Sequence, residues 1–148
     1  SHSGSVALKG SAKAPSQSDE FTTAASDHDL ARFGELMRNK GRLGGKQIVP
    51  ESVVAKIEAG ADKTAFAAAK YATLTGWSYK SQWWVSHDSH GAYMARGIHG
   101  QALYIDPKAE MVIARFASHP VAGNVANDPI SLPAYRAMAD ALAGGKRR

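Results

Sequence analysis

Two glycines lie three residues apart in the segment Gly97-Ile98-His99-Gly100-Gln101, inside sequence that otherwise favours β-strands. Glycines in strand-like sequence mark a place where the backbone bends or where another group approaches it closely. A pair of backbone N–H groups aimed into such a gap can stabilise an oxyanion, with the histidine alongside as a hydrogen-bonding group. A plain β-bulge with a surface histidine explains the same pattern, and the local sequence leaves both open.

Two adjacent tryptophans, Trp83 and Trp84, lie in a stretch where aromatic and polar residues alternate. Successive side chains of a β-strand point to opposite faces, so the two indoles are predicted to lie on opposite faces of a sheet. One of them then packs into the core, and the other is free to line a pocket.

The histidines carry a weaker signal. His87 and His90 have a spacing that occurs in metal sites, and Asp88 would add an oxygen ligand. In a turn that also holds serine and glycine, such a pair is more often solvated surface, so neither a metal site nor a cofactor is predicted. His28 and His119 stand alone in the sequence and are interpreted as structural or exposed residues.

The elements before these residues are predicted to be helical. Apolar residues recur at three- and four-residue spacing over residues 30–37, and Ser26 with Asp29 is typical of a capping box. A second helix is predicted from Pro50, because proline suits the first turn of a helix. Residues 59–70 fit either a helix or a loop.

Strands are predicted to follow. Residues 77–86 are expected to form one half-buried strand, because aromatic and polar residues alternate there with period two. Shorter strand pieces over residues 92–95 and 101–105 flank the two glycines. Asp106-Pro107 is typical of a type I turn, and a strand is predicted after it over residues 111–116.

A final helix is predicted to begin near Ser131, with a serine cap, and to end at Gly144. Its buried face is expected to consist of Leu132, Tyr135, Met138, Ala139 and Leu142. Because this helix would cover the sheet, the predicted fold class is α+β, an antiparallel meander covered by a C-terminal helix.

The composition of the 148 residues is that of an ordinary globular domain, with 44% hydrophobic and 21% charged residues and no cysteine. No apolar run is long enough to predict a membrane-spanning helix. The net charge of +5 falls to +2 without the basic tail at residues 146–148, and the aromatic residues are not interleaved with basic ones. We therefore expect neither nucleic acid nor membrane as a partner, and a cytoplasmic location. Residues 1–26 are expected to be a flexible linker or a scar of expression cloning, before a domain over residues 27–148.

Several segments of the sequence resemble a known family. Similarity to the C-terminal third of serine hydrolases of the β-lactamase and penicillin-binding-protein superfamily extends over residues 29–37, 45–52, 76–77 and 97–107. Within that superfamily, the segments Trp83-Trp84-Val85-Ser86-His87, 95–107 and 117–124 are most similar to 6-aminohexanoate-dimer hydrolases, relatives of carboxylesterases. The resemblance implies that about residues 27–143 form the C-terminal portion of a β-lactamase-like α/β sandwich.

Two of the three motifs that the resemblance implies are absent from this sequence. The family uses a serine nucleophile in S-x-x-K, a second motif led by tyrosine or serine, and a third motif, commonly K-[ST]-G, on a strand. No lysine here has a serine three residues before it, and no asparagine has a serine or tyrosine two residues before it. Ala95-Arg96-Gly97 occupies the place of the third motif, with Ile98 next as the implied oxyanion N–H donor. The departure from lysine and serine or threonine favours an amide or ester substrate over a β-lactam.

The resemblance thus implies the C-terminal part of a hydrolase that cleaves linear amides or carboxylic esters through an acyl-enzyme. Ile98 would donate its backbone N–H to the oxyanion, and Gly97, Trp84 and His99 would contact the substrate. The implied partner is a missing N-terminal part or a second copy, because this chain alone would expose a sheet edge and an apolar face. Two alternatives remain: a non-catalytic truncated module that binds a partner, and an α+β domain of unrelated function.

Overall fold

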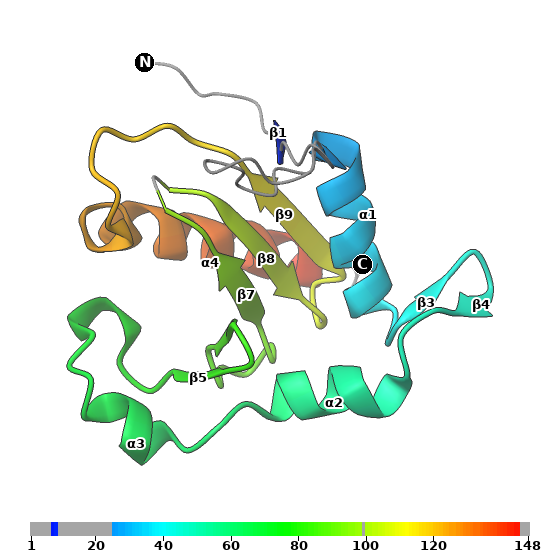
Figure 1. The fold of residues 1–148 in the computed structure, drawn as a ribbon, viewed down its shortest axis with the longest axis horizontal. Coiled ribbons are helices and arrows are strands. Elements are labelled where there is room, and N and C mark those ends of the chain that lie inside the picture. The colour runs from blue at the N-terminus through cyan, green and yellow to red at the C-terminus, as the bar shows by residue number, and fades with distance from the viewer. Residues whose placement is uncertain (1–6, 9–24, 99, 146–148) are drawn as a thin grey trace, which may run out of the picture.

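Five antiparallel strands form the central sheet of the molecule (Figure 1). In chain order and in sheet order they are β5 (Ser78–Lys80), β6 (Trp83–Val85), β7 (Tyr93–Arg96), β8 (Ala102–Asp106) and β9 (Met111–Arg115). Each strand pairs with the next one along the chain. The predicted antiparallel meander and the α+β class are therefore confirmed.

The structure is a computed structural model that describes residues 7–8, 25–98 and 100–145. Its helices are α1 (Asp27–Arg38), α2 (Glu51–Ala59), α3 (Lys63–Ala67) and α4 (Asp128–Gly145), with short 3-10 helices η1 (Ala72–Leu74) and η2 (Asn124–Ala126). Outside the central sheet, β1 (Ala7–Leu8) pairs with β2 (Ala25–Ser26), and β3 (Arg42–Leu43) pairs with β4 (Lys46–Gln47). Residues 1–6 and 9–24 of the expected linker, His99 and the basic tail at residues 146–148 lie outside the described residues. Within the described ranges, no helix has the length and apolar character needed to cross a membrane.

The sheet separates two hydrophobic cores, because alternate side chains of each strand point to opposite faces. Tyr135 and Ala139 of α4 pack against one face. Met37 of α1 and Val54 of α2 pack against the other face. The strand residues that meet them there are Trp83, Val85, Tyr93, Leu103 and Ile105. The sheet is thus covered by α4, as predicted, and on its other side by α1 and α2 (Figure 1).

The prediction of one strand over residues 77–86 is wrong. The chain turns back at Ser81 and Gln82, whose φ angles are 52° and 68°, so that Tyr79 of β5 pairs with Trp84 of β6. Positive φ at both central residues is the geometry of a type I′ hairpin turn, for which Asn-Gly is the usual signal. The sequence has no Asn-Gly here, and the alternation of aromatic and polar residues continues through Ser81 and Gln82, so the sequence gives no sign of the turn.

The last helix begins earlier than predicted and runs further. It starts at Asp128 rather than near Ser131, and the carbonyl of Asn127 accepts hydrogen bonds from the N–H groups of Ile130 at 3.1 Å and of Ser131 at 2.8 Å. Its last residue is Gly145, so Gly144 does not end the helix. The serine cap is therefore wrong, since Ser131 lies inside the first turn.

The predicted apolar face of α4 is only partly correct. Tyr135 and Ala139 are buried, and Leu132 packs at the edge of the same core. Met138 and Leu142 are 46% and 49% exposed and do not belong to that face. The sheet therefore meets a narrower stripe of α4 than the spacing of apolar residues implied.

Candidate functional site

The two glycines of the predicted bend lie in the turn between β7 and β8. The N–H of Gly97 donates to the carbonyl of Gln101 at 3.0 Å, and the N–H of Gln101 donates to the carbonyl of Ile98 at 3.2 Å. Gly100 has a φ of +85°, which favours glycine. The Ile98 side chain is 62% exposed. The glycines therefore shape a hairpin turn with Ile98 on its outer side, and not a bulge within one strand.

The segment between β9 and α4 holds this hairpin turn in place. The side-chain amide of Asn124 donates from Nδ2 to the carbonyl of Gly97 at 2.8 Å. The ring of His119 lies so close to Gly100 that a Cβ there would come within 2.2 Å of His119 Cδ2. In Figure 1, this segment runs past the tip of the β7–β8 hairpin before it enters η2 and α4.

Trp83 and Trp84 lie on opposite faces of the sheet, as predicted. Trp83 belongs to the core under α1, whereas Trp84 packs at the edge of the core under α4. The ring centroid of Trp84 lies 4.6 Å from that of Tyr79 and 5.5 Å from that of Tyr71. Together with Phe66, these three rings line an open hollow of about 570 Å³. The tryptophan that the sequence left free to line a pocket is therefore Trp84.

Arg96 connects Trp84 to the start of α4. Its guanidinium carbon lies 5.2 Å from the centroid of the Trp84 ring, and its Nη2 lies 2.5 Å from Oδ1 of Asp128. The hydroxyl of Thr73 donates to the other carboxylate oxygen of Asp128 at 2.7 Å. The side chains of Arg96 and Asp128 are only 7% and 6% exposed. Because both charges are buried and paired, the guanidinium is fixed in place beside the hairpin turn.

The predicted substrate contacts do not all converge on one hollow. Trp84 lines the hollow against α3, whereas Gly97 lines a second one of about 200 Å³, next to Phe33 and Phe116. Arg96 lines the second hollow, and its guanidinium lies against Trp84. Whether Gly97, Ile98 and Trp84 contact a substrate remains a prediction, and His99 lies outside the described residues.

The spacing of His87 and His90 does not produce a shared site. His87 Nε2 lies 2.6 Å from the hydroxyl oxygen of Ser78, which also accepts the N–H of Ala61 at 3.0 Å. Burial lowers the pKa of His87, and the nearby ammonium of Lys63 lowers it further. Ser78 is fully buried. The Ser78 hydroxyl is therefore closed to solvent, and the pair links β5 to the turn after β6.

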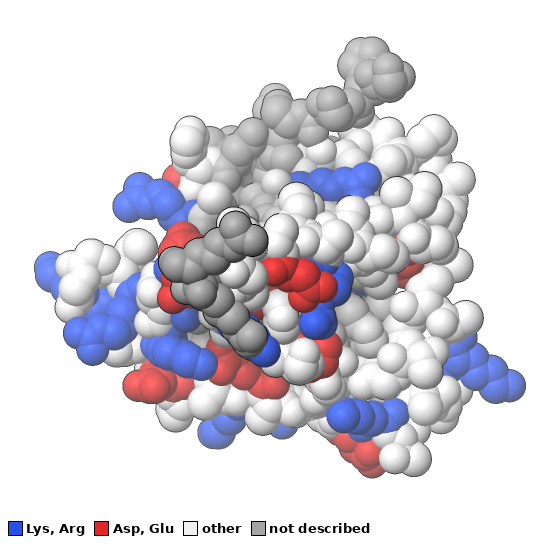
Figure 2. All heavy atoms as spheres, turned by 180° about the vertical axis from the view of Figure 1, so that it is seen from behind, with Lys and Arg blue, Asp and Glu red and all other residues white. Residues whose placement is uncertain are grey.

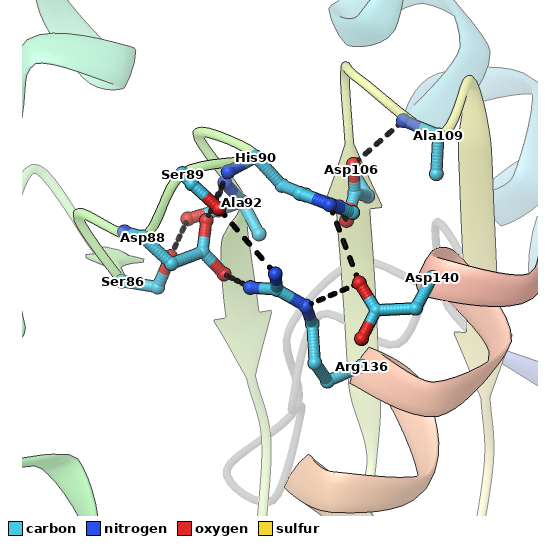
Figure 3. Close-up of polar contacts among 9 residues, drawn as sticks. All are labelled: Ser86, Asp88, Ser89, His90, Ala92, Asp106, Ala109, Arg136 and Asp140. Carbon is cyan, nitrogen blue, oxygen red and sulfur yellow. Dashed lines mark hydrogen bonds and ion pairs between the residues drawn. The ribbon is translucent and has the colours of Figure 1, made fainter. Parts of the chain in front are cut away.

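His90 instead lies in a polar network, drawn in Figure 3, in which His90 and Asp106 are buried while Arg136 and Asp140 reach the surface. Its Nδ1 is 2.8 Å from Oδ2 of Asp106, and its Nε2 is 3.4 Å from Oδ1 of Asp140. Arg136 bridges the same Asp140 oxygen, at 2.8 Å, and Asp88, at 3.0 Å. This network ties α4 to the ends of β6 and β8. Among the described residues, no group of three or more histidine, aspartate or glutamate side chains could hold a metal ion.

Charges of both signs lie on the side of the molecule that α4 covers. Figure 2 shows this side from behind, with lysine and arginine interspersed with aspartate and glutamate. Part of this mixing comes from ion pairs such as Arg136 with Asp140.

Comparison with known proteins gives two informative matches, although no family model matches the chain. A curated 6-aminohexanoate-dimer hydrolase from Paenarthrobacter ureafaciens is 33% identical over 93 residues, which are 62% of this chain and 24% of that protein. A solved structure from Bacillus anthracis, provisionally assigned as a 6-aminohexanoate-dimer hydrolase, matches with a TM-score of 0.66 and 35% identity. That match covers 83% of this chain and 31% of the other. The chain thus spans about a quarter to a third of the length of these relatives.

The sequence and fold matches relate this chain to the β-lactamase-like hydrolases. The relatives that it matches are of the 6-aminohexanoate-dimer hydrolase type, as the resemblance of its motifs implied. The expected fold class is confirmed by the structural match, and the partial coverage of both relatives fits a fragment of such a hydrolase.

Sequence reasoning missed three residues that hold the hairpin turn and its neighbour Arg96 in place. Asn124 and His119 reach the turn from the segment after β9, and Asp128 pairs with Arg96 from the start of α4. Local patterns give no signal for such contacts, because 27 residues separate Asn124 from Gly97 and 32 separate Asp128 from Arg96. The one available hint is an acidic residue close before a predicted helix, where aspartate is favoured.

Proposed function

We propose that this chain is the C-terminal part of a serine hydrolase that cleaves linear amides of the 6-aminohexanoate-oligomer type, or carboxylic esters, through an acyl-enzyme. The observation that carries the proposal is the β7–β8 turn at Gly97 and Ile98. The resemblance of the sequence assigns this turn to the family's third motif; in the structure the Ile98 side chain is exposed, and Asn124 donates to the Gly97 carbonyl. The similarity to hydrolases over most of the chain supports the same assignment.

In this proposal Ile98 supplies its backbone N–H to the oxyanion. The N–H of Gly97 already donates to Gln101 within the hairpin, whereas the N–H of Ile98 makes no backbone hydrogen bond within the described residues. The serine oxygen attacks the substrate carbonyl, its proton passes to a base, and the carbonyl oxygen becomes an oxyanion that the Ile98 N–H stabilises. Collapse of that intermediate expels the amine or alcohol with the proton, and water then hydrolyses the acyl-enzyme.

The nucleophile and the base must come from outside these 148 residues, since the sequence holds no S-x-x-K. The test uses the protein encoded by the complete reading frame that contains this chain, with p-nitrophenyl acyl esters and the 6-aminohexanoate dimer as substrates. The proposal expects turnover of one of them, with a burst of p-nitrophenol close to one equivalent of enzyme. No turnover of either substrate and no burst would contradict it.

A second candidate function is a non-catalytic module that binds a partner. It is favoured by exposed apolar side chains close together in sequence before and within α4, namely Val121, Val125, Ile130, Met138 and Leu142. The partner would be the remaining part of a β-lactamase-like domain or a second copy of this chain. Size-exclusion chromatography with light scattering distinguishes these cases: a compact monomer that binds nothing counts against this function.

A further inference from the structure

Asn124 contacts the peptide unit that carries the proposed oxyanion donor. Its Nδ2 donates to the carbonyl oxygen of Gly97 at 2.8 Å, and the N–H of Ile98 belongs to the same peptide. A peptide bond is planar and trans, so its C=O and N–H point in opposite directions. A group that fixes the direction of the Gly97 carbonyl therefore also fixes the direction of the Ile98 N–H.

The N–H of Ile98 therefore points away from the Asn124 amide. Asn124 is itself half-buried in an otherwise mostly exposed segment before α4, and its amide contacts the carbonyl side of the peptide. Within the described residues this N–H makes no backbone hydrogen bond, in contrast to those of Gly97 and Gln101. A donor held in one direction before substrate arrives loses little free energy to reorganisation during reaction.

The other end of the turn is fixed by His119. Its ring packs against Gly100, whose φ of +85° and lack of a Cβ leave room for it. Nη2 of Arg115 lies 2.6 Å from His119 Nε2, and a guanidinium can only donate, so Nε2 accepts and the proton of the neutral ring lies on Nδ1. Arg115 in turn donates to Ser131 Oγ of α4 at 2.5 Å. The turn is therefore held at both of its glycines by side chains of one segment.

From these contacts we infer that Asn124 is a positioning residue, which orients the Gly97–Ile98 peptide so that its N–H can stabilise the oxyanion. The inference rests on the proposed function for the role of Ile98. It adds that catalysis depends on a side-chain amide that touches neither substrate nor nucleophile. An aspartate at this position keeps the shape but loses the donor, and its carboxylate would repel the Gly97 carbonyl.

The first test measures kinetics in the complete hydrolase with Asn124→Asp. We expect kcat to fall about 10-fold to 100-fold while KM stays within about twofold, because the lost interaction acts on the transition state alone. The matched control is Asn127→Asp, a half-buried asparagine of the same segment next to the start of α4, where aspartate is equally suitable. It should leave kcat and KM unchanged. An Asn124→Asp enzyme with wild-type kcat, or with a change in KM alone, would overturn the inference.

The second test reads the contact itself by NMR on the 148-residue chain. The Gly97 carbonyl ¹³C and the Ile98 amide should shift in Asn124→Asp and not in Asn127→Asp, with the remaining amides of the sheet unmoved. Unchanged Gly97 and Ile98 signals would show that Asn124 does not orient this peptide. A complete protein without a nucleophile would instead contradict the proposed function, and with it the catalytic role of the contact, whatever the NMR shows.

Discussion

Arg96 lies over the ring of Trp84, 5.2 Å from its centroid, and this stacked guanidinium is also the partner of buried Asp128. The arrangement places a fixed positive charge directly before the Gly97–Ile98 turn. It also joins β6, β7 and α4 through three side chains. The residue directly before Gly97 thus supports the fold through its contacts with Trp84 and Asp128.

Removal of Asp128 is predicted to destabilise the fold strongly. Asp128→Ala leaves the buried Arg96 charge unpaired, which should lower the free energy of unfolding by about 3 kcal/mol or more. Urea denaturation measures the change. The control is Asp62→Asn, which removes a carboxylate from the exposed N-cap of α3, where asparagine also caps well. Equal and small losses in both variants would contradict the account of this ion pair.

Alanine at Gly100 is predicted to cost more than alanine at Gly44. Both glycines have positive φ, but a Cβ at Gly100 would also meet the ring of His119, whereas a Cβ at Gly44 would meet nothing within 4 Å. Gly100→Ala should therefore lower the free energy of unfolding by at least about 1 kcal/mol more than Gly44→Ala. Thermal denaturation of the two variants gives the comparison, and equal losses would mean that His119 does not press on Gly100.

Tyr93→Phe is predicted to leave the protein as stable as before or to stabilise it by about 1 kcal/mol, because the buried Tyr93 hydroxyl has no partner among the described residues. Burial raises the pKa of this hydroxyl well above its usual range, and nearby Glu58 raises it further, so it stays protonated. Tyr135→Phe is the matched control, since the Tyr135 hydroxyl accepts from Arg115 at 3.3 Å and its loss should destabilise. A marked loss of stability in Tyr93→Phe would reveal a partner for the hydroxyl.

Stability is predicted to fall in acid partly through His87. Burial lowers the pKa of His87 in the folded chain, so the unfolded chain takes up the proton more readily. The stability that neutral His87 contributes is fully present above the unfolded-state pKa of 6.5 and is lost as the pH falls through the lower pKa of the folded chain. In His87→Gln, which can still accept from Ser78, the loss of unfolding free energy between about pH 8 and about pH 5 should be smaller. An identical loss in both proteins would contradict this role.

The sequence was informative where one strand or one turn decides the structure. Alternation along a strand correctly placed Trp83 and Trp84 on opposite faces of the sheet. The predicted turn at Asp106 forms as well, with the N–H of Ala109 donating to the Asp106 carboxylate at 2.8 Å. Both features depend on neighbouring residues and standard strand geometry alone.

Sequence reasoning failed where tertiary contacts override local signals. Ser81 and Gln82 adopt positive φ without the usual turn residues, since pairing of the aromatic strands on either side outweighs their local preference. α4 begins at Asp128, before the predicted start near Ser131, because Arg96 and Thr73 hold the Asp128 carboxylate. In the same way, spacing along the chain could locate the Gly97 turn but not the amide of Asn124 that orients it.

The central claim is that the turn at Ile98 serves a serine nucleophile from outside these 148 residues. The most direct measurement treats the complete protein and the 148-residue chain with a fluorophosphonate probe and maps the labelled peptide by mass spectrometry. The account predicts a label on the serine of an S-x-x-K motif in the complete protein, and none on the 148-residue chain. A label on a serine within residues 1–148 would contradict it.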